Sequence, residues 1–328
     1  MTTLSRKRLG RTDMEITRVG FGAWAVGGGG WANGWGAQDD DDSVATIRHA
    51  VDSGINWIDT AAVYGHGHSE EVVARAVREI PDVDRPLVFT KGGLGWNEAD
   101  HMEQATRRGG ADAIRRDVDD SLRRLGVDRI DLFQMHWPSE DGSSVEEYWG
   151  VFAELQQQGK LRAIGLSNHD VASLERAEVV AHVDSLQPPF SAIRTEAATS
   201  GLLDWCADHG TAAIVYSPMG SGLLTGAITA ERVAAMPQDD WRRRSPAFTT
   251  DLDRNLATGA AIARVAERHG VSQAAAAVAW TLGFNGVTGA IVGARKPEQI
   301  DGWISGAEVA LTAEDYADVG SATPFQRQ

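Results

Sequence analysis

Four side chains that carry acid–base chemistry follow three successive apolar segments of the sequence. Asp59 ends residues 55–59, with Tyr64 shortly after it, Lys91 ends residues 87–91, and His136 lies in residues 130–137. A charged side chain at the end of a buried strand needs a partner, because burying it alone costs free energy. Each residue taken singly is typical of an ordinary surface ion pair. Together they predict one acid–base group at a common rim.

The chemistry of this group follows from the four residue types. Free tyrosine has a pKa near about 10, which is too high for efficient proton transfer at neutral pH. A nearby ammonium such as that of Lys91 lowers this pKa, and Asp59 would keep the ammonium charged and oriented. A neutral His136 would donate a hydrogen bond to a substrate carbonyl oxygen. We therefore expect Tyr64 to be the proton donor and His136 to orient the substrate.

The segments that carry these residues belong to a series of short apolar runs. Such runs are typical of parallel strands that are buried on both faces. We expect eight strands, at residues 19–25, 55–59, 87–91, 130–137, 161–167, 183–187, 211–217 and 288–293.

Amphipathic helical stretches lie between the predicted strands, at residues 43–53, 69–79, 112–125, 145–158, 171–180, 202–209, 256–269 and 297–305. Asp42 or Ser43 is expected to cap the first of them. Several stretches end in a glycine that suits a left-handed helix cap, namely Gly54, Gly126, Gly159, Gly210 and Gly270. Alternating strands and helices in this number predict an α/β fold, a (β/α)8 TIM barrel formed as one domain by residues 1–328.

Three further segments modify this barrel. An extra helix is expected at residues 272–284, before strand eight, and an N-terminal β-hairpin at residues 7–17 is expected over the barrel floor. Residues 27–38 and 223–252 form long loops. Loops of this length on a barrel are usually functional, although a surface insertion without fixed structure is the alternative.

Composition narrows the classes of function. The chain of 328 residues has a formal net charge of −15 and one cysteine, Cys206. An acidic chain repels phosphate backbones and anionic lipids, so we expect no nucleic-acid or membrane partner. A single cysteine forms no internal disulfide, and no apolar run is long enough to span a bilayer. The expected location is the cytoplasm, and the oligomeric state is not indicated.

The sequence from Asp59 to Gly65 (DTAAVYG), followed by Ser69 and Glu70, resembles the signature of the aldo-keto reductase family. Lys91 after its apolar strand and the run His136-Trp137-Pro138 match the rest of that family's catalytic tetrad. The similarity spans nearly the whole chain and is greatest to longer bacterial members with an extended first loop. It implies hydride transfer from NADPH to a carbonyl carbon, or the reverse reaction with NADP+.

The resemblance also implies a set of cofactor-binding positions. Ser167, Asn168 and Gln187 would hold the nicotinamide carboxamide, while Tyr216 would stack on the ring and Trp24 and Asp59 would lie beside it. Residues after strand seven, most of them small, would approach the pyrophosphate, namely Ser217, Gly220, Gly222, Leu223 and Gly226. Gly293, Arg295 and Gln299 follow strand eight, where Arg295 and Lys296 suit a 2′-phosphate and favour NADPH.

Two positions depart from the family pattern. Asp301-Gly302-Trp303 stands where an acidic residue and an asparagine are usual, so the adenine contacts differ. His169 follows Asn168 where the family usually has phenylalanine, and we interpret it as a change at the surface or behind the site.

The substrate is expected to be a small carbonyl compound or a sugar. Tyr64 and His136 would contact its oxygen, and Trp24, Trp96 and Trp137 would wall the pocket, since indole faces pack against sugar rings and aromatic aldehydes. Core filling is the alternative role for each tryptophan.

Other functions remain open on the sequence. His66-Gly67-His68 has the His-x-His form of some barrel metal hydrolases, yet no third ligand is spaced nearby, so we expect no metal. Lys91 could form a Schiff base, which would require an uncharged amine. An aldose dehydrogenase would run the same chemistry in the oxidative direction. A non-catalytic NADPH-binding regulatory subunit is the alternative outside enzymes.

Overall fold

Eight parallel strands form a closed barrel in the computed structural model, which describes residues 4–236 and 240–320. Around the barrel they are β3 (Val19–Gly22), β4 (Trp57–Asp59), β5 (Leu87–Gly92), β8 (Ile130–Met135), β9 (Leu161–Ser167), β10 (Ser185–Gln187), β11 (Ala212–Tyr216) and β12 (Val287–Gly293). β12 closes the barrel by pairing with β3, where Ala290 lies opposite Val19. All eight predicted strands and the TIM-barrel fold are confirmed.

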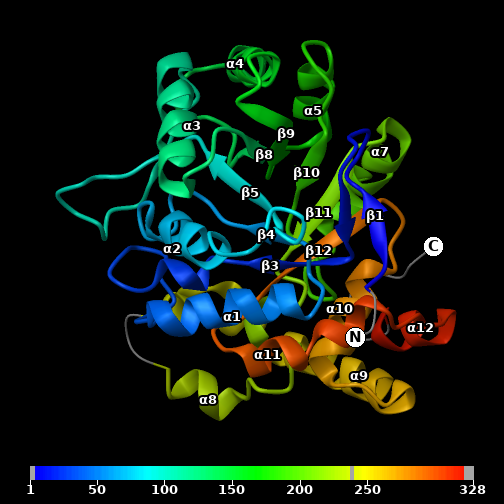
Figure 1. The fold of residues 1–328 in the computed structure, drawn as a ribbon. Coiled ribbons are helices and arrows are strands. Elements are labelled where there is room, and N and C mark those ends of the chain that lie inside the picture. Colours follow the sequence, from blue (N-terminus) through cyan, green and yellow to red (C-terminus); the bar gives the residue numbers. More distant parts are fainter. Residues whose placement is uncertain (1–3, 237–239, 321–328) are drawn as a thin grey trace.

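Helices surround the strands (Figure 1). They are α1 (Asp40–Asp52), α2 (His68–Val77), α3 (Ala111–Leu125), α4 (Val145–Gln157), α5 (Val171–Glu178), α6 (Glu196–Thr199), α7 (Leu202–His209), α9 (Leu252–His269), α10 (Gln273–Leu282), α11 (Pro297–Asp301) and α12 (Ala313–Gly320). The extra helix expected before the eighth strand is α10, and it packs against β12 and α9.

The first helix begins earlier than predicted, so its expected cap is wrong. Asp39 is the N-cap of α1, and its carboxylate accepts hydrogen bonds from the backbone N–H groups of Asp41 (2.9 Å) and Asp42 (3.1 Å). Asp42 therefore lies inside the first turn, where the helix dipole stabilises negative charge. At the other helix ends the prediction is confirmed, since Gly126 and Gly210 adopt left-handed C-caps.

The N-terminal hairpin closes the floor of the barrel. β1 (Arg6–Arg8) pairs antiparallel with β2 (Glu15–Thr17), and the hairpin lies at the right-hand end of the molecule in Figure 1. Its apolar side chains pack with residues from the strands in one buried cluster, which comprises Leu9, Met14, Ile16, Trp57, Phe89, Leu132, Ala163, Ala212, Ile214 and Ile291. The turn needs Gly10, because its φ is +56° and a Cβ there would lie 2.4 Å from the Asp184 carbonyl oxygen.

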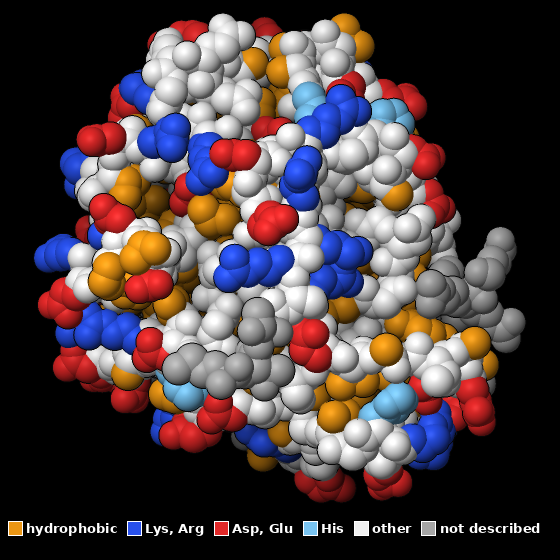
Figure 2. Space-filling view, turned by 45° about the vertical axis from the view of Figure 1, so that its right-hand side comes forward, with side chains coloured by type: hydrophobic (Ala, Val, Ile, Leu, Met, Phe, Trp, Pro, Cys, Tyr) orange, Lys and Arg blue, Asp and Glu red, His pale blue; other side chains and the backbone are white. Residues whose placement is uncertain are grey.

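The face turned forward in Figure 2 mixes charges of both signs. Lysine and arginine side chains lie beside acidic ones over this view, and apolar atoms are scattered between them. Within residues 4–236 and 240–320, no helix has the length and apolar character that a membrane crossing would require.

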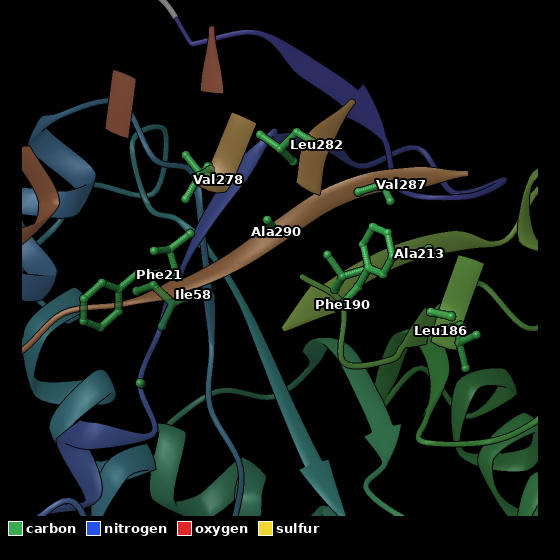
Figure 3. Close-up of a cluster of buried hydrophobic side chains, with 14 of the residues drawn as sticks. Phe21, Ile58, Leu186, Phe190, Ala213, Val278, Leu282, Val287 and Ala290 are labelled. Atoms are coloured by element: carbon green, nitrogen blue, oxygen red, sulfur yellow. The ribbon is translucent and has the colours of Figure 1, made fainter. Parts of the chain in front are cut away.

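The main apolar core lies between the barrel and its helices. Figure 3 shows Val278 and Leu282 of α10 beside Val287 and Ala290 of β12, and all four side chains are buried. This layer holds the strands in register, and so fixes the positions at which their carboxyl ends emerge.

Both long loops have defined structure at the mouth opposite the hairpin. The 3-10 turn η1 (Ala25–Gly27) leads into the first loop. The turn η2 (Gly220–Gly222) precedes the second loop, which contains α8 (Ala230–Ala234), η3 (Trp241–Arg244) and η4 (Pro246–Phe248), with residues 237–239 outside the described part. The second loop has its own buried cluster of Leu223, Ile228, Val233, Met236 and Phe248. Its described residues are therefore packed, unlike an insertion without fixed structure.

Candidate active site

Lys91 and Asp59 form a buried ion pair across neighbouring strands. Lys91, near the end of β5, is 1% exposed, and its Nζ donates to Oδ1 of Asp59 at 2.5 Å and to the Thr60 carbonyl oxygen at 2.9 Å. In the pairing of β4 with β5, Asp59 lies opposite Phe89, so the side chain of Lys91, two residues further along β5, spans this step to reach Asp59. Full pairing is required here, because a lone buried charge would be strongly destabilising.

Tyr64 completes the group just above this pair. Nζ of Lys91 lies 5.2 Å from the centroid of the Tyr64 ring, and the edge of the His136 ring approaches it with centroids 5.8 Å apart. Trp24, which follows β3, stacks on the Tyr64 ring with centroids 6.2 Å apart. The structure therefore brings together all four predicted catalytic residues at the carboxyl-terminal mouth of the barrel.

The pKa of Tyr64 shifts in the direction opposite to our expectation. Burial raises it well above the ordinary value of 10.0, and the Asp59 carboxylate raises it further. The expected lowering by Lys91 is absent because burial, the largest cause, and the Asp59 carboxylate both favour the neutral phenol. The phenol is therefore protonated at neutral pH, as a proton donor must be, but this shift does not make it a stronger acid.

His136 is neutral, as expected. Burial, aided by the positive charge of Lys91, lowers its pKa well below 6.5. Its Nδ1 is buried without a hydrogen-bond partner among the described residues. A neutral imidazole with an uncommitted nitrogen can orient an incoming polar atom.

A second layer of amides supports Asp59. Nε2 of Gln187 donates to Oδ2 of Asp59 at 2.9 Å and to Oε1 of Gln134 at 3.2 Å, and Nε2 of Gln134 lies 3.4 Å from the same carboxylate oxygen. Gln134 was missed in the sequence. Its signal was its spacing, because it lies two residues before His136, and residues two apart on a strand face the same side.

The predicted carboxamide-binding residues form a connected network. Tyr216 donates its hydroxyl to Oδ1 of Asn168 at 2.9 Å, and Nδ2 of Asn168 donates to the His136 carbonyl oxygen at 2.9 Å. Oγ of Ser167 donates to the Gln187 carbonyl oxygen at 2.9 Å. The network links the ends of β8, β9, β10 and β11, so it holds these side chains in one layer below the mouth.

Backbone strain marks the same layer. Asn168 follows β9 with φ +61°, and Ser217 follows β11 with φ +59°. Non-glycine residues rarely adopt this region and cluster at functional sites. The neighbouring Tyr216 is partly buried, and burial raises the pKa of its phenol to about 12.

The predicted pyrophosphate segment after β11 divides into two parts. Ser217, Gly220 and Gly222 lie partly exposed on the turn above the strand. The Leu223 side chain is buried in the second loop's own cluster, so only its backbone could meet a ligand. Gly226 has a φ of +77°, a left-handed conformation that favours glycine at this turn.

Gly293, Arg295 and Gln299 lie at and after the end of β12, the strand that pairs with β11. Gly293 ends β12 and is exposed, and Oε1 of Gln299 accepts from the Arg295 backbone N–H at 2.6 Å. Arg295, Lys296 and Gln299 share a surface hollow of about 380 Å³ with Ala37, Gln38, Asp39 and Asp42. Positive and negative side chains thus face the same space.

Aromatic side chains wall the mouth. Trp137 lies under the Arg107 guanidinium, 4.4 Å from ring centroid to Cζ, and Trp96 stacks on His66 with centroids 5.1 Å apart. Trp96 is carried by the small sheet of β6 (Leu94–Gly95) and β7 (Thr106–Arg107).

A further wall residue, Trp241, was missed. It reaches across from the second loop, stacks on Trp24 at 5.9 Å and meets Trp35 edge-on at 5.6 Å. The sequence offered one signal for it, namely its position in a long loop directly before three arginines.

His66 and His68 point to different partners. His66 packs among Trp31, Trp96 and His101, whereas Nε2 of His68 lies 2.9 Å from Oδ1 of Asp40. The described residues contain no group of three or more His, Cys, Asp or Glu side chains suited to a metal ion.

His169 is not a surface residue, which corrects one of our two interpretations. It is 2% exposed, its Nδ1 lies 2.8 Å from the Ser167 carbonyl oxygen, and its Nε2 lies 2.7 Å from the Tyr148 hydroxyl. Nδ1 therefore donates to Ser167 and Nε2 accepts from Tyr148. His169 supports the carboxamide layer from behind.

Comparison with known proteins agrees with this geometry. The sequence profile of the Aldo/keto reductase family matches residues 18–323. This chain belongs to the aldo-keto reductase family. By family it is therefore an oxidoreductase rather than a barrel hydrolase or aldolase. The matched residues include all eight barrel strands.

Relatives match over almost their whole length. Aldo-keto reductase YhdN of Bacillus subtilis (strain 168) is 35% identical, over 94% of this chain and 91% of that protein. NADH-specific methylglyoxal reductase of Escherichia coli (strain K12) is 32% identical, over 94% of each. The glycerol dehydrogenase AKR11B4 from Gluconobacter oxydans superposes with a TM-score of 0.87 and 38% identity, over 97% of this chain and 94% of that one.

Proposed function

We propose that this protein is an NADP(H)-dependent oxidoreductase that reduces aldehydes or ketones to alcohols, with Tyr64 as the general acid. The observation that carries the proposal is the position of Tyr64 between the Lys91–Asp59 ion pair and a neutral His136. The active domain is inferred to comprise the whole chain, residues 1–328.

The proton step follows from the two side chains above the ion pair. The raised pKa of Tyr64 keeps its hydroxyl protonated until a substrate oxygen develops negative charge. His136, kept neutral by its lowered pKa, holds that oxygen in position. As the carbonyl oxygen takes the Tyr64 proton, the resulting phenolate lies close to the Lys91 ammonium, which stabilises it.

The cofactor residues fit a nicotinamide carboxamide. Gln187 uses both N–H bonds of its amide on Asp59 and Gln134, and no described residue donates to its Oε1, which leaves an acceptor for a carboxamide N–H. Ser167 and Asn168 lie in the same layer, and Tyr216 offers a ring face for stacking. When bound, the reduced nicotinamide supplies the hydride.

The preference for NADPH rests on Arg295 and Lys296. Both cations line one hollow at the end of β12, where a 2′-phosphate would gain charge-assisted hydrogen bonds. Asp39 and Asp42 line the same hollow and oppose a phosphate, and the similar Escherichia coli enzyme is NADH-specific by name. Rates measured with both cofactors test the preference directly.

Small polar carbonyls are the proposed substrates. Tryptophan faces wall the mouth beside Tyr64, and the relatives' names include methylglyoxal reductase and glycerol dehydrogenase. The name glycerol dehydrogenase favours a second candidate function, in which the same residues oxidise a polyol or an aldose by the reverse reaction. A panel of aldehydes, ketones, polyols and aldose sugars, followed by nicotinamide absorbance in both directions, distinguishes the two.

Tyr64→Phe tests the assignment of the proton donor. We expect it to lower kcat for the best carbonyl substrate by about 10²–10⁴-fold, because general acid catalysis is lost. NADPH binding, measured by titration calorimetry, should stay within about threefold of the parent, since no cofactor contact is removed.

Equal loss of binding and turnover in Tyr64→Phe would contradict the role of Tyr64 in proton transfer. Cofactor binding without turnover of any substrate by the parent protein would instead favour a non-catalytic NADPH-binding subunit.

A further inference from the structure

We propose that Arg295 is a positioning residue: it holds the end of the first loop, and through Trp35 it positions the aromatic wall against Tyr64. The inference rests on the proposed function and deepens it, because it couples the end of the site that receives the cofactor's adenosine to the end that receives the carbonyl.

Arg295 is joined to the first loop by its whole guanidinium. Nε donates to Oε1 of Gln38 at 2.7 Å, Nη1 lies 3.4 Å from the Trp35 carbonyl oxygen, and Nη2 donates to the Ala37 carbonyl oxygen. Gln38 returns a bond from Nε2 to the Arg295 carbonyl oxygen at 3.1 Å. Three of five guanidinium N–H groups are thereby used, so about two remain for a phosphate.

The loop depends on this tie because of its composition. Residues 27–38 contain six glycines, and glycine loses more backbone entropy on ordering than any other residue. The middle of the loop has other partners, since Ala32 N donates to the His101 carbonyl oxygen and Asn33 Nδ2 to Gln104. The end of the loop, residues 35–38, is different. Among the described residues, every hydrogen bond that joins it to another segment of the chain involves Arg295.

Trp35 connects the loop end that Arg295 holds to Tyr64. Its ring lies edge-on to Trp24, with centroids 5.4 Å apart, and Trp24 stacks on Tyr64. Trp35 also meets Trp241, and the Arg242 guanidinium lies 5.2 Å from the Trp35 ring centroid. The described portions of both long loops therefore converge on the residue that Arg295 holds.

Substrate kinetics with NADH separate this role from phosphate binding, because NADH carries no 2′-phosphate. With saturating NADH, Arg295→Ala and Gln38→Leu should each raise the KM of the carbonyl substrate by about threefold or more, because the wall beside Tyr64 is no longer fixed. Arg295→Lys keeps the positive charge but loses the planar fork, so it should raise this KM as well. An unchanged KM in Arg295→Ala would overturn the proposal.

A readout without turnover keeps this test independent of the proposed function. In protein labelled with fluorotryptophan, the fluorine NMR signals of Trp35 and Trp24 are assigned by their loss in Trp35→Phe and Trp24→Phe. Both signals should shift or broaden in Arg295→Ala and Gln38→Leu, whereas Lys296→Ala, a neighbouring cation in the same hollow, should leave them in place. Unmoved signals in Arg295→Ala and Gln38→Leu would refute the positioning role of Arg295, whether or not the protein is a reductase.

Discussion

At the residue scale, burial sets the direction of both pKa shifts at the site, because it disfavours the charged form of each group. Nζ of Lys91 lies 5.2 Å from the Tyr64 ring centroid, yet burial and, after it, the Asp59 carboxylate raise the pKa of the phenol. His136 has its pKa lowered by burial and, after it, by the positive charge of Lys91. The site therefore keeps one group protonated and its neighbour neutral over the physiological pH range.

His169 makes the folded protein sensitive to acid. Burial lowers its pKa to about 4, against 6.5 for a free histidine. Between these pH values the unfolded chain binds a proton that the folded chain does not, so stability falls as pH falls. Between pH 7 and pH 5 the loss is about 2 kcal/mol from this residue. His169→Phe removes the proton site. Between pH 7 and pH 5, the free energy of unfolding measured in urea should therefore fall by about 2 kcal/mol less in this variant than in the parent.

The comparison needs one matched variant. His169→Phe also leaves the Tyr148 hydroxyl without its partner, which lowers stability at both pH values. The double variant Tyr148→Phe/His169→Phe removes that cost and should show the same reduced pH dependence. If all three proteins lost stability equally between the two pH values, His169 would not be the acid-sensitive group.

At the scale of elements, the second loop behaves as a small folded unit with its own core. Phe248 is 2% exposed, packs with Val233 and Met236, and lies edge-on to Trp241. We expect Phe248→Ala to open this unit locally, because truncating a buried aromatic side chain costs about 3–5 kcal/mol. Trypsin should then cleave after Arg242–Arg244 at least about tenfold faster, as resolved by mass spectrometry.

A core substitution elsewhere provides the control. Phe152→Ala removes a fully buried ring on α4, so it should lower the unfolding temperature without selective cleavage in the second loop. Unchanged proteolysis of Phe248→Ala would show that the loop does not depend on its own cluster.

These elements differ in how far the sequence could predict them. Apolar runs and glycine ends placed all eight strands and the extra helix, because each signal is local. The start of α1 was misplaced because several adjacent aspartates can each cap a helix, and Asp39 does so. The structure of the second loop, and the arrival of Trp241 against Trp24, depend on contacts between distant segments that no local pattern encodes.

The candidate site shows the same division. The spacing of Asp59, Tyr64, Lys91 and His136 predicted their convergence, since barrel strands end at a common rim. The tie between Arg295 and the first loop was not predicted, because it depends on which carbonyl oxygens the loop presents. Sequence identified Arg295 only as a cation near a helix N-terminus.

At the scale of the whole molecule, the two ends of the barrel have separate tasks. The hairpin end is filled with apolar side chains, whereas the mouth carries the titratable group. Ile16→Ala, a fully buried change in the hairpin, should lower the free energy of unfolding by about 2–5 kcal/mol. Its kcat and KM should stay close to those of the parent at a temperature where both are folded.

Arg8→Ala, an exposed change in the same hairpin, should change stability by less than about 0.5 kcal/mol. A substantial fall in kcat for Ile16→Ala would show that the hairpin end influences the mouth, contrary to this division. Unfolding in urea and steady-state kinetics on the same samples measure both quantities.

The pairing of β12 with β3 also affects how the chain folds during its synthesis. β3 leaves the ribosome early, but the strand that completes its pairing is made near the end of synthesis. At about 5–20 residues per second, β3 keeps one edge open for tens of seconds before its partner emerges. During translation this nascent chain is therefore exposed to mispairing with neighbours, and holdase chaperones that shield its first strand should raise the yield of enzyme.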